Sequence, residues 1–157
     1  MNSSGPVIVN GNVSWNFPLP FPSGFQFVAI QANSFIQQPI YLATGSYTIS
    51  FTYCSRSGSN INPIEILIDD VVIGTSPNIS TSVWTPFSLS FNISQNRIVV
   101  LKLLGTSLSD QTTGVDNVTI TWFIFICNNK KILSIFLNSF YSLFCDYDFP
   151  NISLYFY

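Results

Sequence analysis

Apolar and polar residues alternate in two neighbouring stretches of the chain, which a polar loop separates. From Tyr47 to Tyr53, an aromatic residue or an isoleucine stands at every second position. Residues 64–69 repeat this pattern with three isoleucines. Because side chains along a β-strand point alternately to its two faces, the alternation predicts two half-buried strands. Two sheets packed face to face would bury one face of each.

Similar patterns between turns of Gly, Pro, Asn and Ser predict further strands at residues 7–9, 25–31, 35–42, 71–73, 83–93, 98–104 and 115–121. The segment 98–104 is almost entirely apolar, which predicts a central strand covered on both faces. Four prolines within residues 1–24 exclude a helix, so we expect a loop there whose aromatic residues lie over the edge of the sandwich. The whole pattern predicts an all-β jelly-roll sandwich of about eight antiparallel strands.

The composition changes after Thr121. Residues 122–157 contain no Gly, Ala, Val or Thr and are crowded with Phe, Ile, Leu, Tyr and Asn. We therefore assign residues 1–121 to the sandwich and residues 122–157 to a hydrophobic tail that is not part of it. The longest uncharged run of this tail, residues 132–145, is shorter than the roughly 20 residues of a membrane-spanning helix. Two interpretations stay open: a membrane-associating or oligomerising tail, and a translated A/T-rich segment beyond the domain, which we favour.

Charge and composition exclude several classes of function. Only 8% of the residues are charged and the formal net charge is −2, so nucleic acid is not an expected partner. The chain has no His, the commonest general base and metal ligand. The adjacent carboxylates of Asp69 and Asp70 would diverge and could not flank one glycosidic bond. We therefore do not expect an enzyme.

Several short motifs, in order over residues 22–121, resemble those of galactose-binding-like jelly-roll domains. They are PSGFQFVAIQ (22–31), QPIYL (38–42), GSYTISFTYCSRSG (45–58), NPIEI (62–66), Trp84 before a Phe/Leu strand, Leu104-Gly105 and GVDNVTIT (114–121). This group includes carbohydrate-binding modules, plant cell-wall proteins, and surface proteins of bacteria and large DNA viruses. The resemblance implies a glycan or polysaccharide as the partner. The short first strand lacks the acidic residue that often helps to hold calcium in related modules.

A sugar site would combine aromatic rings, which stack on the apolar face of a pyranose, with side chains that bond hydroxyl groups. The candidates for this site are Trp15, Tyr53, Arg56, Asn60 and Trp84. Packing in the core is the alternative role for Trp84 and Tyr53. A structural salt bridge is the alternative for Arg56.

Asp116 is the candidate metal ligand. It is in phase with Val118 and Ile120, so we expect its side chain to point toward the core, where a carboxylate needs a partner. The resemblance implies a structural calcium near this end in some relatives, and an oxygen ligand would suit that ion. The alternatives are capping of backbone N–H groups in the preceding loop and an ion pair with Arg56 or Arg97.

These features lead us to expect a non-catalytic carbohydrate-binding or adhesion module on a cell or virion surface. We expect this extracellular or virion location although the first residues lack the basic and apolar segments of a secretory signal peptide. The alternative is a structural β-sandwich subunit of a fibre or capsid that binds no sugar and exposes a large apolar patch in a homo-oligomer. A membrane contact is expected only through the tail.

Overall fold

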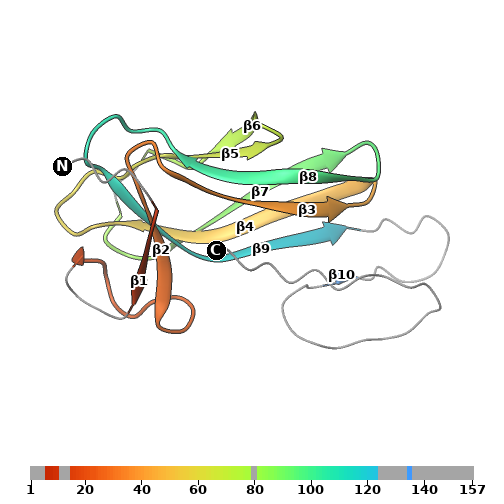
Figure 1. The fold of residues 1–157 in the computed structure, drawn as a ribbon. Helices are drawn as coiled ribbons and strands as arrows, with labels where there is room; N and C mark the ends of the chain where they lie inside the picture. The colour runs from red at the N-terminus through yellow and green to blue at the C-terminus, as the bar shows by residue number, and fades with distance from the viewer. Residues whose placement is uncertain (1–5, 11–14, 79–80, 124–133, 136–157) are drawn as a thin grey trace.

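The computed structural model describes residues 6–10, 15–78, 81–123 and 134–135, and these residues form strands and loops without an α-helix (Figure 1). In chain order the strands are β1 (Val7–Asn10), β2 (Gln26–Gln31), β3 (Phe35–Leu42), β4 (Gly45–Ser55), β5 (Ile64–Ile68), β6 (Val71–Thr75), β7 (Thr85–Ile93), β8 (Arg97–Gly105), β9 (Thr112–Phe123) and the two-residue β10 (Ser134–Ile135). None of the described segments forms a helix that is long and apolar enough to cross a membrane.

The strands build two antiparallel sheets that pack against each other (Figure 1). The larger sheet has the order β1-β2-β9-β4-β7, with β10 paired to β9, and the smaller sheet has the order β3-β8-β5-β6. From β2 to β9 the chain changes sheets at every connection except that from β5 to β6. This arrangement confirms the predicted all-β jelly-roll sandwich.

The main core lies between the sheets and contains the alternating residues that the sequence pattern predicts. The inward-facing residues of β4 are all buried, and those of β5 and β8 meet them from the smaller sheet. Across the strand pair, Tyr47 stacks on Phe91 with 5.6 Å between ring centroids, and Phe51 lies 5.0 Å from Phe87. Full burial of one such side chain stabilises the fold by about 1.5–3 kcal/mol.

β8 is central in the smaller sheet, as predicted, but the prediction that it is covered on both faces is wrong. Val99, Leu101 and Leu103 are fully buried, whereas Ile98 on the opposite face is 69% exposed. An apolar run does not by itself show what covers a second face. Here the outer face carries Lys102, whose ammonium lies 5.0 Å from the centroid of the Phe35 ring.

The last long strand continues past Thr121, where the sequence analysis ended the sandwich. Trp122 of β9 packs against the main core and stacks on Tyr47 at 6.2 Å between ring centroids, so it belongs to the sandwich. β10 pairs with Trp122 and Phe123. Apart from these residues, the predicted tail lies outside the described part of the chain, and its separation from the sandwich stays a prediction.

A second hydrophobic cluster covers the outer face of the larger sheet. Its buried members are Val9, Phe17, Phe27, Ala29 and Cys54, and Trp15, Phe21 and Trp84 pack around them. The aromatic residues of the N-terminal loop therefore lie over the sheet. The Trp84 ring packs against them, with 5.2 Å between its centroid and that of the Phe27 ring. The indole N–H of Trp84 donates to the carbonyl of Pro18 over 2.9 Å, which satisfies its polar atom.

We predict that Trp84→Ala lowers the free energy of unfolding by about 2–3 kcal/mol, because it removes a half-buried ring from an aromatic cluster together with its hydrogen bond. Denaturant unfolding followed by circular dichroism measures this loss. The control is Val83→Ala, which changes the exposed neighbouring side chain and should leave the stability within about 0.5 kcal/mol. Equal effects of the two substitutions would contradict the packing role of Trp84.

Candidate functional site

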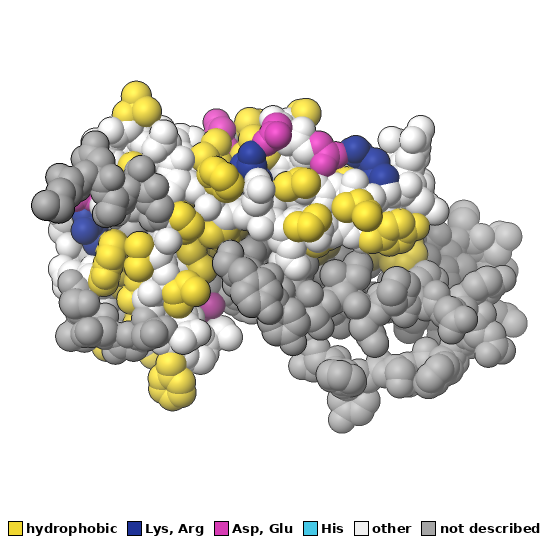
Figure 2. Space-filling model, viewed as in Figure 1, with side chains coloured by type: hydrophobic (Ala, Val, Ile, Leu, Met, Phe, Trp, Pro, Cys, Tyr) yellow, Lys and Arg dark blue, Asp and Glu magenta, His cyan; other side chains and the backbone are white. Residues whose placement is uncertain are grey.

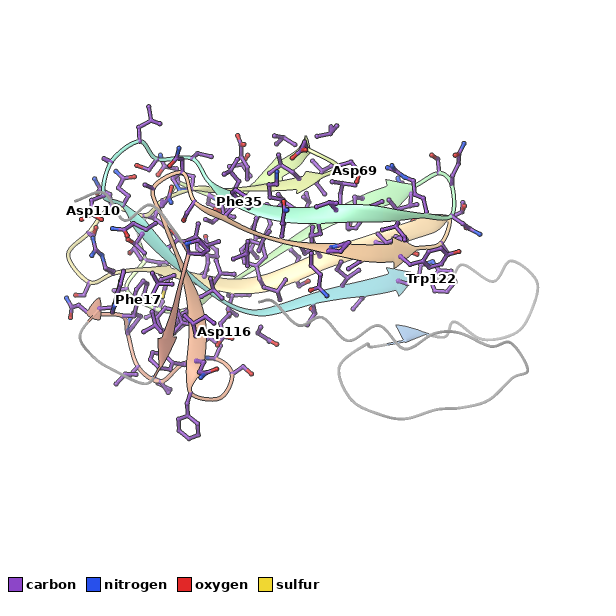
Figure 3. The ribbon with its side chains drawn as sticks, viewed as in Figure 1. Phe17, Phe35, Asp69, Asp110, Asp116 and Trp122 are labelled. Atoms are coloured by element: carbon purple, nitrogen blue, oxygen red, sulfur yellow. The ribbon has the colours of Figure 1, made fainter. Side chains whose placement is uncertain are left out.

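Three loops meet at the end of the sandwich that Asp110 marks in Figure 3. They are residues 32–34 between β2 and β3, residues 56–63 between β4 and β5, and residues 106–111 between β8 and β9. Backbone hydrogen bonds tie them together, from Ala32 N to Gln111 O over 2.9 Å and from Thr106 N to Pro63 O over 3.0 Å. This end is therefore one joined surface rather than three independent loops.

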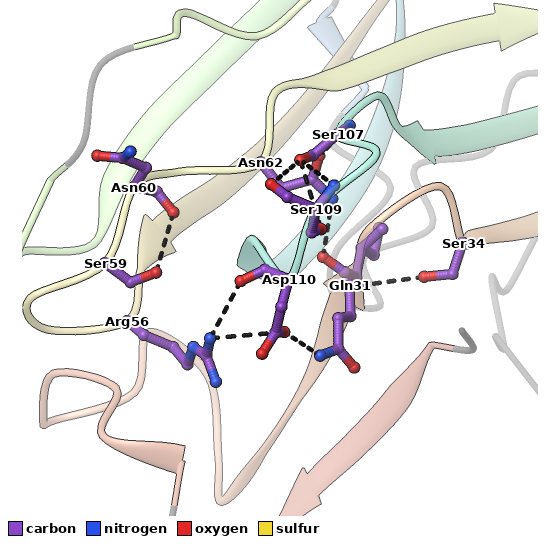
Figure 4. Close-up of polar contacts among 10 residues, drawn as sticks. Gln31, Ser34, Arg56, Ser59, Asn60, Asn62, Ser107, Ser109 and Asp110 are labelled. Carbon is purple, nitrogen blue, oxygen red and sulfur yellow. Dashed lines mark hydrogen bonds and ion pairs between the residues drawn. The ribbon is translucent and has the colours of Figure 1, made fainter. Parts of the chain in front are cut away.

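A buried amide fixes the three loops from inside (Figure 4). Asn62 is fully buried, and its Nδ2 donates to the carbonyls of Ala32, over 2.7 Å, and Ile30. Its Oδ1 accepts from Ser107 N over 2.9 Å, so one side chain bonds two other loops. Its own backbone N–H and C=O bond the hydroxyl of Thr113. A buried polar group that is satisfied in this way holds the surrounding backbone in one arrangement.

Asn62 is not among the site residues predicted from the sequence. The available signal is the Asn-Pro pair in front of β5, because Asn side chains bond nearby backbone groups in turns. That signal predicts a local turn but not a partner in a distant loop.

Four polar residues lie at this end of the sandwich, and we call Gln31, Arg56, Asn60 and Asp110 the loop rim. The side chain of Asn60 points away from the other three (Figure 4). The carboxylate of Asp110 accepts a hydrogen bond from Gln31 Nε2. Arg56 Nη2 lies 3.7 Å from Asp110 Oδ1 and donates to the Asp110 backbone carbonyl over 3.4 Å. The salt bridge expected as the alternative for Arg56 is therefore present.

The rim keeps polar groups in contact with solvent. The exposed fraction is 26% for the Arg56 side chain and 70% for that of Asp110, and Asn60 is exposed as well. An ion pair this open adds little to stability. The guanidinium has five N–H donors in a fixed plane, so it can contact Asp110 and a ligand together.

The structure separates the other candidate sugar-binding residues. Tyr53 is 4% exposed in the main core, where no face of its ring is available to a ligand. Trp84 packs in the second cluster, which is the core role considered as its alternative. Trp15 is half-buried beside the same cluster, and the next residue, Asn16, exchanges hydrogen bonds with the backbone of Ser57. The chain at Trp15 is thus held beside the loop that carries Arg56 and Asn60.

Asp116 does not point toward the core as the sequence phase predicted. The register between β4 and β9 shifts at this point, and Asn117 adopts a φ of 53°, so Asp116 and Val118 are no longer in phase. Asp116 pairs with Thr52 and faces outward beside the second cluster (Figure 3). Its two carboxylate oxygens accept from Ser23 N over 2.9 Å and from Asn117 N over 2.7 Å. The carboxylate therefore caps backbone N–H groups, but those of Ser23 and Asn117 and not those of the preceding loop, as the alternative had it.

Burial shifts the pKa values of Asp116 and of the nearby Cys54. Burial raises the pKa of Asp116, and the hydrogen bonds from the Ser23 and Asn117 N–H groups oppose this shift. Burial, with the Asp116 charge as a smaller cause, also raises the pKa of the Cys54 thiol. Cys54 is therefore a protonated packing residue and not an activated nucleophile.

The donor set at Asp116 does not fit a calcium ion. Calcium takes six to eight oxygen ligands, usually from several carboxylates. Asp116 offers one carboxylate, whose oxygens already accept backbone hydrogen bonds. Across the described residues, no three or more His, Cys, Asp or Glu side chains are grouped so that they could hold a metal ion.

Comparison with known proteins identifies the fold. No protein-family model and no curated protein sequence matches the chain. A family 35 carbohydrate-binding module from Clostridium thermocellum matches with a TM-score of 0.53 and 18% identity, over 73% of this chain and 90% of that one. The carbohydrate-binding module CBM36 in complex with calcium and xylotriose matches with a TM-score of 0.52 and 20% identity, over 73% of this chain and 98% of the module. The chain therefore has the galactose-binding-like jelly-roll fold that its motifs imply.

We predict that Asn62→Ala lowers the free energy of unfolding by roughly 2–4 kcal/mol, since it leaves buried carbonyl and N–H groups without partners. Thermal or denaturant unfolding measures the loss. Asn60→Ala is the matched control, because it removes an exposed amide from the same loop, and its stability should stay near that of the unmodified chain. A small effect of Asn62→Ala would show that water replaces its hydrogen bonds.

We predict that Asp116→Asn has a pH-dependent effect on the melting temperature. The raised pKa means that the folded state favours the neutral carboxyl group, a contribution present below the unfolded pKa and lost as pH rises through the folded pKa. The amide stays neutral throughout. The melting temperature of the variant minus that of the unmodified chain should therefore be more positive at pH 7 than at pH 3. A pH-independent difference would contradict the raised pKa.

Proposed function

We propose that this chain is a non-catalytic carbohydrate-binding module and that the loop rim is its sugar site. The two solved structures compared above are carbohydrate-binding modules, and one of them is a complex with calcium and xylotriose. Within the chain, the observation that carries the proposal is the contact among the Gln31, Arg56 and Asp110 side chains, which holds solvent-accessible polar groups side by side at the joined loops. We place the module on a cell or virion surface, where glycans are available.

The rim has the chemistry that sugar hydroxyl groups require. Arg56 donates hydrogen bonds, Asp110 accepts them, and the amides of Gln31 and Asn60 do both. Each hydroxyl is a donor and an acceptor, so mixed groups of this kind can bond a pair of neighbouring hydroxyls. Because Asn62 holds the loops beneath the rim, little conformational entropy is lost on binding. Trp15 is the aromatic residue we assign to the edge of this site.

The titratable groups outside the rim support a module without catalysis. Asp69 bonds Arg97 over 2.5 Å and the Val100 N–H over 2.8 Å, and Asp70 pairs with Lys102. These carboxylates are engaged in structural ion pairs on the smaller sheet. The thiol of Cys54 is buried and has a raised pKa, so it is not a nucleophile.

One observation favours the alternative, a structural sandwich subunit that binds no sugar. Hydrophobic side chains spread among charged ones over the outer face of the smaller sheet (Figure 2). They include Phe35 and Tyr41 of β3, Val71 of β6 and Ile98 of β8, all exposed. Apolar surface of this kind can be covered in an assembly. The two functions are separated by whether the folded chain binds glycans.

We predict that the full chain binds specific members of a broad glycan and polysaccharide screen, and that Arg56→Ala and Asn60→Ala each weaken binding at least about tenfold. Isothermal titration with the best glycan measures the affinities. Arg97→Ala is the matched control, since this arginine also pairs with an aspartate but lies on the smaller sheet, and it should bind normally.

Three results would count against this proposal. Full binding by both rim variants would place the sugar site elsewhere on the sandwich. Equal losses in Arg97→Ala would indicate a general charge effect. A folded chain that binds nothing in the screen would favour the structural subunit.

A further inference from the structure

β7 forms an edge of the larger sheet. It pairs with β4 on one side, and no other strand among the described residues pairs with its second side. The strand is nine residues long, so it presents a long row of outward backbone N–H and C=O groups. Unprotected edges of this kind accept a further strand.

Apart from one proline near its start, β7 lacks the usual protection against strand addition. Residues 85–93 read TPFSLSFNI, with no charge and with one proline near the start. The edge strands of the smaller sheet differ: β3 carries Pro39 at its centre, and β6 directly follows the carboxylates of Asp69 and Asp70. Proline and charge at an edge discourage pairing. Of the four edge strands β1, β7, β3 and β6, β7 is the longest, and it carries neither a charge nor a proline at its centre.

The pattern of β7 is also self-complementary. Residues 87–91 read Phe-Ser-Leu-Ser-Phe, which is the same in both directions about Leu89. If a second copy pairs antiparallel about a two-fold axis at Leu89, Phe87 lies opposite Phe91 of the second copy. In the same register, Ser88 lies opposite Ser90 of the second copy. Aromatic residues then lie opposite aromatic residues on one face of the sheet, and serines lie opposite serines on the other.

The molecule already contains this type of pairing. β4 places Phe51 opposite Phe87 and Tyr47 opposite Phe91, with both aromatic pairs in contact. On the outer face, the hydroxyl groups of Thr48 and Ser90 are 2.9 Å apart. A second copy of β7 would offer the same alternation of aromatic and hydroxyl side chains as β4 does. Phe87, Leu89 and Phe91 are only half-buried, so a further strand would cover them more completely.

We propose that two copies of this chain associate through β7, antiparallel and about a two-fold axis at Leu89, into one continuous sheet. The interaction is isologous, and its main-chain hydrogen bonds come from a strand whose outer edge is otherwise open. Because each copy contributes a single strand, the association is reversible and concentration-dependent.

The test places charges on the outer face of β7, where Ser88 and Ser90 are exposed and their hydroxyl groups contact those of Ser50 and Thr48 on β4. In the proposed register, S88K/S90K sets lysine opposite lysine across the two-fold axis and should weaken the dimer at least tenfold. S88E/S90K sets glutamate opposite lysine in both directions and should retain it, more strongly at low salt. Sedimentation velocity of the full chain and both variants over a range of concentrations measures the association.

The expected result is a dimer for the unmodified chain and for S88E/S90K, and a monomer for S88K/S90K that stays folded, with the circular dichroism spectrum of the unmodified chain. A monomeric unmodified chain at the highest concentration would overturn the proposal. Undiminished assembly of S88K/S90K would place the contact on another surface, and loss of the dimer in both variants would overturn the two-fold register. Glycan binding at the loop rim is measured separately, so neither proposal depends on the other.

Discussion

Burial of the inner face of β4 is the interaction on which the rest of the structure depends. β4 lies between β9 and β7, and its inward residues form the centre of the main core. Tyr47 shows the connection, because its ring stacks on Phe91 of β7 and on Trp122 of β9. Its hydroxyl donates to the carbonyl of Ala43 over 2.9 Å, which satisfies the polar atom of a buried ring. One strand thus fixes the register of both neighbours.

A chain with so few charges must keep its outer surface soluble by other means. On the outer face of the larger sheet, Ser46 bonds Asn92 over 2.7 Å and Ser50 bonds Ser88 over 3.2 Å. These neutral pairs satisfy each other across the strands and leave hydroxyl groups facing water. Neutral side chains, however, do not repel a second strand as charges do. The same neutral residues that keep the sheet face hydrated therefore leave the β7 edge open.

The sequence predicts the strands well because burial of one face imposes a two-residue period that propensity alone does not. It predicts less where one residue changes the phase or joins distant segments. Asn117 inserts a bulge that turns Asp116 outward, and its only sequence signal is that Asn tolerates a positive φ. Trp84 contacts the N-terminal loop, and Asn62 bonds two other loops. The hydrophobic period of the sequence predicts neither interaction, because the partners are far apart in the chain.

The positions of the loop rim and the β7 edge lead to a consequence for binding. Thr85 at the start of β7 pairs with Tyr53 near the rim, and Ile93 at its end pairs with Gly45 at the far end of the sandwich. Two β7 strands that pair antiparallel therefore point their rims in opposite directions. Such a dimer would bridge two glycan chains rather than hold one surface with both sites, because a single flat surface could not reach both rims. Together, the two proposals describe a module that would cross-link glycans.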